Sequence, residues 1–212
     1  MTIPSHRRGA DARVLRIIGG AWRGRRLRFV SGAGIRPTPD RVRETLFNWL
    51  GPGIAGSRCL DLFAGSGALG LEALSRGAAA VTFVERDRAV ARDLSQRLQE
   101  WGAVDARVAH ADALAFLAPA ARADVAPQAR ADVALPARFD IVFLDPPFAD
   151  GVLAGAARLL EARGWLAPAA RIYAECPVRE GLPELPPNWQ LQRAKRAGEV
   201  GYHLLIRSAV PT

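Results

Sequence analysis

The sequence contains little of several residues that mark specialised classes of protein. Only two of its 212 residues are cysteines, Cys59 and Cys176, and each lies in an apolar run. Two such thiols build neither a disulfide framework nor a metal cage, so we expect two reduced core residues and no metal. No run of about 18 apolar residues is present, and the basic N-terminus lacks the apolar core of a signal peptide. We therefore expect a cytoplasmic protein with no membrane contact.

Lysine is almost absent, because Lys195 is the only lysine among 29 basic residues. A GC-rich genome explains this preference for arginine but not the position of the charge. Residues 1–43 contain eleven arginines against Asp11 and Asp40, a net charge of +9, whereas the other 169 residues carry −1. A basic arm on a nearly neutral body indicates a phosphate-binding surface. The arginines that we expect to contact RNA are Arg16, Arg23, Arg25, Arg26, Arg28, Arg36, Arg41 and Arg43.

The first part of the chain predicts a tail, a hairpin and a helix. Residues 1–13 have no periodicity and read as a flexible basic tail, and the segments 14–18 and 25–30 flank a glycine-rich turn typical of a β-hairpin. A helix is predicted over 39–50, with Thr38 as its N-cap and Pro39 at its first position. Its apolar residues share one side, and the opposite side carries Arg41, Arg43 and Glu44.

From residue 58 onwards, strand and helix patterns alternate. The expected strands are 58–63, 80–84, 106–109, 139–144 and 171–176, and the expected helices are 67–76, 87–101, 113–117 and 152–163. Such alternation gives a parallel sheet with helices on both faces. Segments 190–195 and 200–207 predict a final antiparallel hairpin, so the fold class is α/β. Residues 121–128 and 129–136 are a tandem duplication, which we interpret as a loop expansion within 118–138 without an assigned function.

The first chemical motif lies between the first of these strands and its helix. Gly65-Ser66-Gly67-Ala68-Leu69-Gly70 matches the G-x-G-x-x-G pattern of dinucleotide-binding turns, and Glu85 ends the next strand. Glycines let a ligand approach the backbone, and a carboxylate at the strand end can accept both ribose hydroxyls. This pattern predicts a ligand of the nucleotide type.

Asp61 distinguishes between two classes of such ligands. It ends the first strand, so its carboxylate should face the same cavity as the glycine loop, where it would repel a pyrophosphate. The cationic amino group and sulfonium of S-adenosylmethionine would be favoured instead. Asp112 follows the third strand and is positioned either to accept a hydrogen bond from the adenine amine or to cap the next helix; the two roles are compatible.

The second chemical motif is Asp145-Pro146-Pro147-Phe148, directly after an apolar strand. Ligands of open α/β sheets bind outside the carboxyl ends of the strands, so this turn should face the glycine loop. The lone pair of an exocyclic base amine is delocalised into the ring. The Asp145 carboxylate and the Pro146 carbonyl, as acceptors of its two N–H groups, would direct that lone pair toward a methyl donor. Phe148 can stack on a flipped-out base. The turn therefore predicts amine methylation.

The N-terminal block and both motifs together resemble the RsmD family, bacterial 16S ribosomal RNA guanine-N2 methyltransferases. The resemblance is carried by Arg16-Ile17-Ile18-Gly19-Gly20, Trp22-Arg23-Gly24, Arg36-Pro37-Thr38, residues 40–50, the glycine loop and the Asp145 turn. It implies a class I S-adenosylmethionine-dependent methyltransferase, Rossmann-like with a mostly parallel seven-stranded sheet, over 35–212, preceded by an rRNA-binding hairpin over 14–34. It further implies a donor site formed by Asp61, Ala64, Gly65, Ser66, Gly67, Glu85, Arg86, Asp112 and Ala113. Asp145, Pro146, Pro147 and Phe148 would hold the guanine.

Other readings explain parts of the sequence. The Asp145 turn by itself also fits adenine-N6 or other exocyclic-amine methyltransferases acting on RNA or DNA. An NAD-dependent oxidoreductase explains the glycine loop but not Asp61. A cytosine-C5 methyltransferase requires a cysteine nucleophile, for which Cys176 is the one candidate, and a non-catalytic RNA-binding module explains only the arginines. We expect a monomer acting on the 16S rRNA of the small ribosomal subunit.

Overall fold

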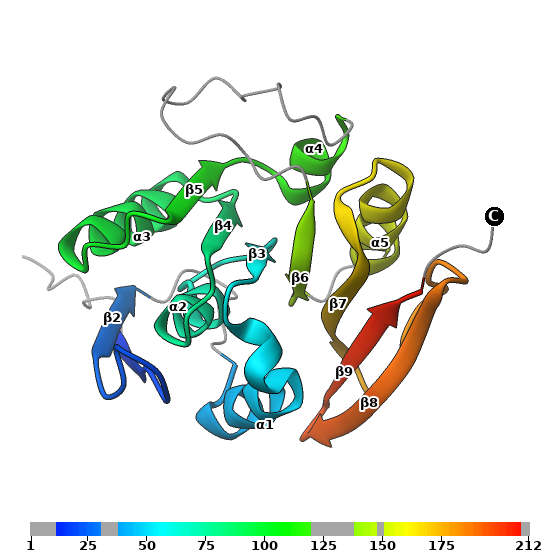
Figure 1. The fold of residues 1–212 in the computed structure, drawn as a ribbon, viewed down its shortest axis with the longest axis horizontal. Helices are drawn as coiled ribbons and strands as arrows, with labels where there is room; N and C mark the ends of the chain where they lie inside the picture. Colours follow the sequence, from blue (N-terminus) through cyan, green and yellow to red (C-terminus); the bar gives the residue numbers. More distant parts are fainter. Residues whose placement is uncertain (1–11, 31–37, 120–137, 148–150, 209–212) are drawn as a thin grey trace, which may run out of the picture.

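The computed structural model describes residues 12–30, 38–119, 138–147 and 151–208 (Figure 1). The strands β1 (Ala12–Arg16) and β2 (Arg26–Val30) come first, followed by α1 (Asp40–Leu50) and a 3-10 turn, Gly51–Ile54. Strands and helices then alternate: β3 (Arg58–Asp61), α2 (Ala68–Ser75), β4 (Ala80–Glu85), α3 (Arg88–Glu100), β5 (Ala106–His110), α4 (Ala113–Leu117), β6 (Phe139–Leu144) and α5 (Val152–Ala162). The last strands are β7 (Leu166–Pro177), β8 (Trp189–Ala197) and β9 (Val200–Arg207).

Seven strands form one sheet in the order β5-β4-β3-β6-β7-β9-β8. The strands from β5 to β7 are parallel, whereas β9 runs antiparallel to both of its neighbours. The predicted parallel sheet and its antiparallel ending are therefore confirmed. β1 and β2 pair separately as an antiparallel hairpin, as the sequence also predicted.

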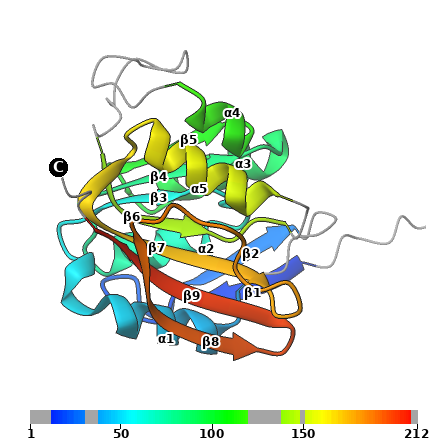
Figure 2. The ribbon, with the colours of Figure 1, turned by 90° about the vertical axis from the view of Figure 1, so that its right-hand side faces the viewer.

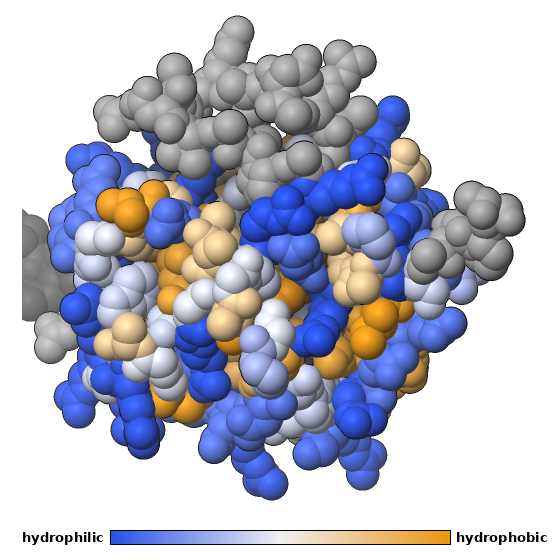
Figure 3. Space-filling view, viewed as in Figure 1, coloured by the Kyte–Doolittle hydropathy of each residue, from blue (hydrophilic) through white to orange (hydrophobic). Residues whose placement is uncertain are grey.

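Hydrophobic residues fill both faces of the sheet in two clusters. One cluster joins the sheet to α1, α2, α3 and the hairpin, through residues such as Leu46, Leu71 and Leu94. The other joins it to α4 and α5, through residues such as Leu117 and Leu160. Figure 2 shows α1 and α5 on opposite sides of the sheet. On the face seen in Figure 3, hydrophilic residues predominate, with apolar residues exposed between them. No helix in the described ranges is long and apolar enough to cross a membrane.

A buried carboxylate, Glu72 on α2, fastens the hairpin to the body of the protein. Its side chain is fully buried and accepts the backbone N–H groups of Ile18 and Gly19, each at 2.8 Å. It also pairs with Arg76 at 2.8 Å and with Arg43 at 3.5 Å. Figure 1 shows the hairpin beside α2. Because four donors converge on one carboxylate, the hairpin and α1 take fixed positions relative to α2.

The beginning of α1 differs from the prediction in two respects. Thr38 is not the N-cap, since the helix begins at Asp40 with Pro39 as its N-cap and no side-chain cap; the Thr38 hydroxyl bonds to Asp145 instead. Arg43 does not lie on an exposed side, because it is fully buried and pairs with Asp40 at 2.6 Å as well as with Glu72. The helical pattern assigned Arg43 to the exposed side, but its ion pair with the buried Glu72 holds it inside the protein. Arg43 is therefore not one of the exposed arginines that we expected to contact RNA.

Other boundaries lie near the expected ones. The helix over 113–117 and the strand over 139–144 are reproduced in full, whereas β7 starts at Leu166, earlier than the predicted residue 171. The predicted tail lies almost entirely, and the duplicated segment entirely, outside the described residues. Cys59 and Cys176 are free and buried, as expected.

Replacing the buried carboxylate Glu72 by glutamine should destabilise the fold. We expect Glu72→Gln to lower the free energy of unfolding by about 3 kcal/mol or more, because the Arg43 guanidinium would remain buried with a partner lost. Urea denaturation measures this loss. The control, Glu44→Gln on the exposed side of α1, should change stability by less than about 0.5 kcal/mol. Equal, small effects of both substitutions would contradict a central role for Glu72.

Candidate active site

The two sequence motifs meet at one edge of the sheet because β3 and β6 are parallel neighbours. Asp61 at the end of β3 lies opposite Phe143 on β6, and the Leu62 N–H donates to the Phe143 carbonyl at 3.2 Å. In the sheet, β3 lies between β4 and β6. The chain passes from β3 to β4 on one flank of β3, and β6 pairs with the other flank. Open α/β sheets bind their ligands at such a switch point.

The glycine loop between β3 and α2 requires glycine at particular positions. Gly65 and Gly67 have φ angles of 50° and 77°, which L-residues with side chains rarely adopt. A Cβ on Gly67 would also lie 2.6 Å from Leu94 of α3, and one on Gly70 would lie 2.2 Å from Phe83 of β4. The glycines thus serve both close packing of α2 on the sheet and an open backbone at the loop.

Asp61 lies under this loop in a buried position. It is 3% exposed and accepts the Gly70 N–H at 2.9 Å. Burial raises the pKa of its carboxyl from 3.8 to about 7, and the charge of Glu85 adds to the shift. A carboxyl held in this way favours a cationic ligand, which would stabilise its ionised form.

Two further acids face the same edge from neighbouring strands. Glu85 at the end of β4 accepts the N–H groups of Gly65 at 2.8 Å and Asp87 at 2.7 Å, so it orders the glycine loop. Each carboxylate oxygen has further lone pairs available for a ligand. Asp112 caps α4 by accepting from Leu114 and Ala115, both at 3.0 Å, which confirms its interpretation as a helix cap.

The turn after β6 brings Asp145, Pro146 and Pro147 to this edge, whereas Phe148 lies outside the described residues. Asp145 is half-buried, and burial of its carboxyl, followed by the charge of Glu175, raises its pKa well above the usual range. The Thr38 hydroxyl donates to Asp145 Oδ2 at 3.2 Å. Thr38, which precedes α1, therefore contacts the turn formed by Asp145, Pro146 and Pro147 directly.

Sequence reasoning missed three residues beside Asp145: Thr38, Tyr173 and Glu175. The Tyr173 hydroxyl donates to Glu175 Oε1 at 2.6 Å, and burial raises the pKa values of both side chains. Glu175 is 5% exposed. A glutamate within the apolar strand pattern of 171–176 was the available signal, since a buried acid is rare overall but frequent at functional sites.

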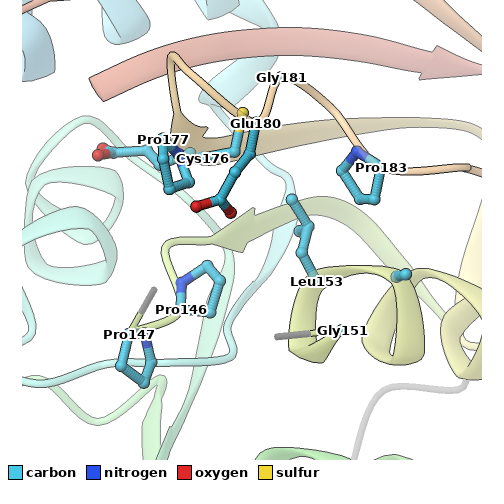
Figure 4. Close-up of a pocket in the computed structure, with 11 residues that line it drawn as sticks. Pro146, Pro147, Gly151, Leu153, Cys176, Pro177, Glu180, Gly181 and Pro183 are labelled. Atoms are coloured by element: carbon cyan, nitrogen blue, oxygen red, sulfur yellow. The ribbon is translucent and has the colours of Figure 1, made fainter. Parts of the chain in front are cut away.

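A pocket opens next to the turn formed by Asp145, Pro146 and Pro147 (Figure 4). It is lined by Pro146 and Pro147, by the end of β7, by the loop that follows β7, and by the start of α5. In Figure 4 the carboxylate of Glu180 points from that loop toward Pro146.

Cys176 lines this pocket too, although it is far from the turn in sequence. Burial, with the charges of Glu180 and Glu175, raises the pKa of its thiol. A nucleophilic cysteine requires a thiolate. The surroundings of Cys176 therefore oppose the cytosine-C5 reading.

The predicted RNA-contacting arginines fall into different surroundings. Arg16, Arg23, Arg25, Arg26 and Arg41 are exposed, Arg43 is buried, and Arg36 and the side chain of Arg28 lie outside the described residues. The Arg25 guanidinium lies 5.8 Å from the ring centre of Trp22 and 5.1 Å from that of Trp101. This contact between the hairpin and the end of α3 leaves a cation at the surface.

The doubly covered sheet with its antiparallel final strands, the glycine loop after β3 and the acidic proline turn after β6 together define a class I methyltransferase. A family model described as "Conserved hypothetical protein 95" matches residues 15–206. The chain belongs to that family, and the resemblance to RsmD is confirmed.

Individual relatives are similar in sequence to nearly the whole of this chain. Ribosomal RNA small subunit methyltransferase D of Escherichia coli (strain K12) is 51% identical over 209 residues, which cover 99% of this chain and 96% of that protein. The protein of the same name from Haemophilus influenzae is 46% identical over 90% of this chain and 92% of its own. The solved structure titled "Putative methyltransferase yhhF from Escherichia coli" aligns with a TM-score of 0.80 at 50% identity, covering 93% of this chain and 99% of that one.

The raised pKa of Asp61 predicts a dependence of stability on pH. Since its folded-state pKa of about 7 exceeds the ordinary 3.8, the bound proton stabilises the fold fully below the lower value, and this contribution is lost as the pH rises to the higher one. Asp61→Asn has no such contribution. We expect the variant to gain stability relative to the unsubstituted protein by about 1.4 kcal/mol per pH unit between these values. Urea titrations at several pH values measure the difference, and a constant difference would contradict the assignment.

Proposed function

We propose that this protein transfers a methyl group from S-adenosylmethionine to the exocyclic N2 of a guanine in the 16S rRNA of the small ribosomal subunit. The observation that carries the proposal is the Asp145 turn beside a pocket, at the same sheet edge as the glycine loop above the buried Asp61. The curated relatives bear the name ribosomal RNA small subunit methyltransferase D, which supports rRNA as the substrate.

The edge formed by β3, β4 and α4 fits S-adenosylmethionine. Asp61 would supply the buried anion for its cationic amino group and sulfonium, Glu85 would accept the ribose hydroxyls, and Asp112 would accept a hydrogen bond from the adenine amine. The residues that would hold the donor are Asp61, Ala64, Gly65, Ser66, Gly67, Glu85, Arg86, Asp112 and Ala113. When bound, the donor supplies an electrophilic methyl on a positively charged sulfur.

The Asp145 turn would hold and orient the guanine amine. The Asp145 carboxylate and the Pro146 carbonyl accept its two N–H groups, which turns the nitrogen lone pair out of the base plane. Pro147 offers no competing N–H, and Phe148 stacks on the base. Positioning of this kind supplies most of the acceleration in a transfer between two bound partners.

The exposed arginines of the hairpin would hold the rRNA backbone while the turn selects the base. Phosphate contacts fix the register of a nucleic acid but carry no sequence information. Selection of one guanine then depends on the pocket and on the fold of the RNA. We propose residues 14–34 as the rRNA-binding extension of a methyltransferase domain over 35–212.

The experiment that tests the function incubates unmodified small ribosomal subunits with isotopically labelled S-adenosylmethionine. Mass spectrometry of the nucleosides then identifies the product. We expect label in N2-methylguanosine from 16S rRNA only. Label in N6-methyladenosine would favour the adenine reading, and absence of label with both subunits and naked rRNA would reject the proposal.

Removing the Asp145 carboxylate should abolish most turnover without weakening donor binding. We expect Asp145→Ala to lower the single-turnover rate by about 10²-fold or more, because an oriented contact to the reacting amine is lost. Equilibrium titration should give an unchanged donor affinity. A rate close to that of the unsubstituted protein would remove Asp145 from the acceptor site.

Neutralising the hairpin arginines should weaken rRNA binding and flatten its dependence on salt. We expect the combined substitution of Arg23, Arg25, Arg26 and Arg28 by glutamine to reduce the slope of log affinity against log salt, because each phosphate contact adds about 0.7 to 0.9 to that slope. The control neutralises Arg158 of α5 and Arg163, which directly follows this helix; both are exposed. An equal slope in both variants would contradict a role of the hairpin arginines in RNA binding, and the GC-rich genome would then be the explanation for them.

A further inference from the structure

The edge strand β8 carries a cluster of basic side chains that the charge of the whole chain conceals. Outside residues 1–43 the chain has a net charge of −1, yet β8 contains Arg193, Lys195 and Arg196 and no acid. Every residue from 190 to 196 is exposed, so none of the described elements covers either face of this part of the strand. These side chains therefore have no role in packing the core.

Within the described residues, no carboxylate forms a salt bridge with any of these three cations. The neighbouring strand β9 differs, since its Arg207 pairs with Glu161 at 2.7 Å. Arg193 donates to the backbone carbonyl of Gln192 at 3.2 Å, a contact that leaves its positive charge uncompensated. Three such charges within four residues attract a polyanion.

The register of the strands places the basic half of β8 beside the pocket. Arg196 pairs with Gly201 of β9, and Gly201 pairs with Cys176 at the end of β7. Cys176 lines the pocket, and two strand spacings amount to about 10 Å. The loop after β7, which also lines the pocket, is held to the β8–β9 turn by the Val178 N–H, which donates to the Glu199 carbonyl at 2.8 Å. The cluster and the pocket therefore lie at the same edge of the sheet.

The turn of the N-terminal hairpin is farther from this edge. α2 begins after the carboxyl end of β3 and leads back along the sheet for eight residues, about 12 Å. At its far end Ser75 Oγ accepts the Trp22 N–H at 2.9 Å, which places Arg23 and Arg25 toward the amino ends of the strands. Figure 1 shows the hairpin and β8 on opposite sides of β6. Contacts at the hairpin turn alone would leave the RNA beside the pocket unheld.

A base that is methylated in a pocket has to leave its stack, which costs free energy. Contacts to the adjoining phosphates offset this cost and fix the register of the RNA without reading its sequence. We propose, on the basis of the proposed function, that residues 193–196 of β8 form a second RNA-binding surface, which holds the phosphates next to the guanine on the side of the pocket opposite the hairpin.

Charged side chains on an edge strand also prevent pairing with the edge of another sheet. The distribution of charge along β8 opposes this as the main role, because the exposed Leu191 lies in the half of the strand that has no charge. Glutamate in place of the basic residues separates the two roles. It keeps the edge charged, and so protected, but it repels phosphates.

The first test measures binding to unmodified small ribosomal subunits. We expect Lys195→Glu combined with Arg196→Glu to weaken this binding by about tenfold or more at about 0.1 M salt, because the counterions that two phosphate contacts release are lost. Glutamine at both positions should reduce the slope of log affinity against log salt by about 1.4 to 1.8. If the glutamine variant self-associates, the glutamate variant still tests the surface.

The matched control combines Arg158→Glu with Arg163→Glu, which makes the same change in net charge. Arg158 lies on α5 and Arg163 directly follows it, where the chain leads to the start of β7; both are exposed. Equal losses of affinity in the two glutamate variants would overturn the proposal, as would an unchanged affinity of the β8 variant. Thermal unfolding establishes that each variant is folded.

The second test measures proximity. Arg196→Cys carries an iron chelate that generates hydroxyl radicals, and the unsubstituted protein treated in the same way is the control, since Cys59 and Cys176 are buried. We expect cleavage of the 16S rRNA backbone at nucleotides adjoining the methylated guanine from position 196 and none there from Arg163→Cys. Absence of such cleavage from position 196 would overturn the proposal.

The single-turnover rate at saturating subunits should change much less than the affinity, because the β8 surface touches no reacting atom. A rate reduced as strongly as the affinity would contradict a role in backbone binding. Failure of the proposed function appears differently, in the unsubstituted protein, as label in a nucleoside other than N2-methylguanosine. Failure of the β8 surface leaves that product unchanged and appears only in the variants.

Discussion

The position of the N-terminal hairpin and of α1 on α2 depends above all on one buried carboxylate, Glu72. It lies on α2, the helix that begins directly after the glycine loop, and it accepts two hairpin N–H groups as well as two guanidinium groups. A buried acid without these four donors would be strongly destabilising. The same interaction therefore fixes the hairpin and α1 on the helix that shapes the donor loop. The surface that we propose to hold RNA phosphates and the loop that we propose to hold the donor thus share this connection.

Thr38 extends this connection to the acceptor turn. It precedes α1, whose Arg43 is held by Glu72, and its hydroxyl bonds to Asp145. The connection from the hairpin through α1 to the Asp145 turn consists of polar contacts in buried surroundings, where unpaired groups are costly. If RNA binds at the hairpin as proposed, these contacts hold it at a defined distance from the pocket beside Pro146 and Pro147.

Much of the fold follows from local sequence signals. The strands over 139–144 and 58–61 are short apolar runs, and the glycines of the donor loop have backbone angles that few other residues adopt, so both were predictable. Thr38 and Arg43 were not predicted correctly, and Glu175 was missed. Arg43 and Thr38 take their roles from distant partners, since Glu72 is 29 residues from Arg43 and Asp145 is 107 residues from Thr38. Helical periodicity and capping preference describe only near neighbours; a tertiary ion pair overrode the first at Arg43 and a tertiary hydrogen bond accompanies the failure of the second at Thr38.

The central claim is that the Asp145 carboxylate holds the amine of a guanine at the edge where β3 and β6 end. A structure of the protein bound to the small ribosomal subunit, with a donor analogue that cannot transfer a methyl group, tests it most directly. The account predicts a flipped guanine with its N2 about 3 Å from the Asp145 carboxylate and from the Pro146 carbonyl, and hairpin arginines on rRNA phosphates. A guanine amine directed away from this turn, or another base in the pocket, would contradict it.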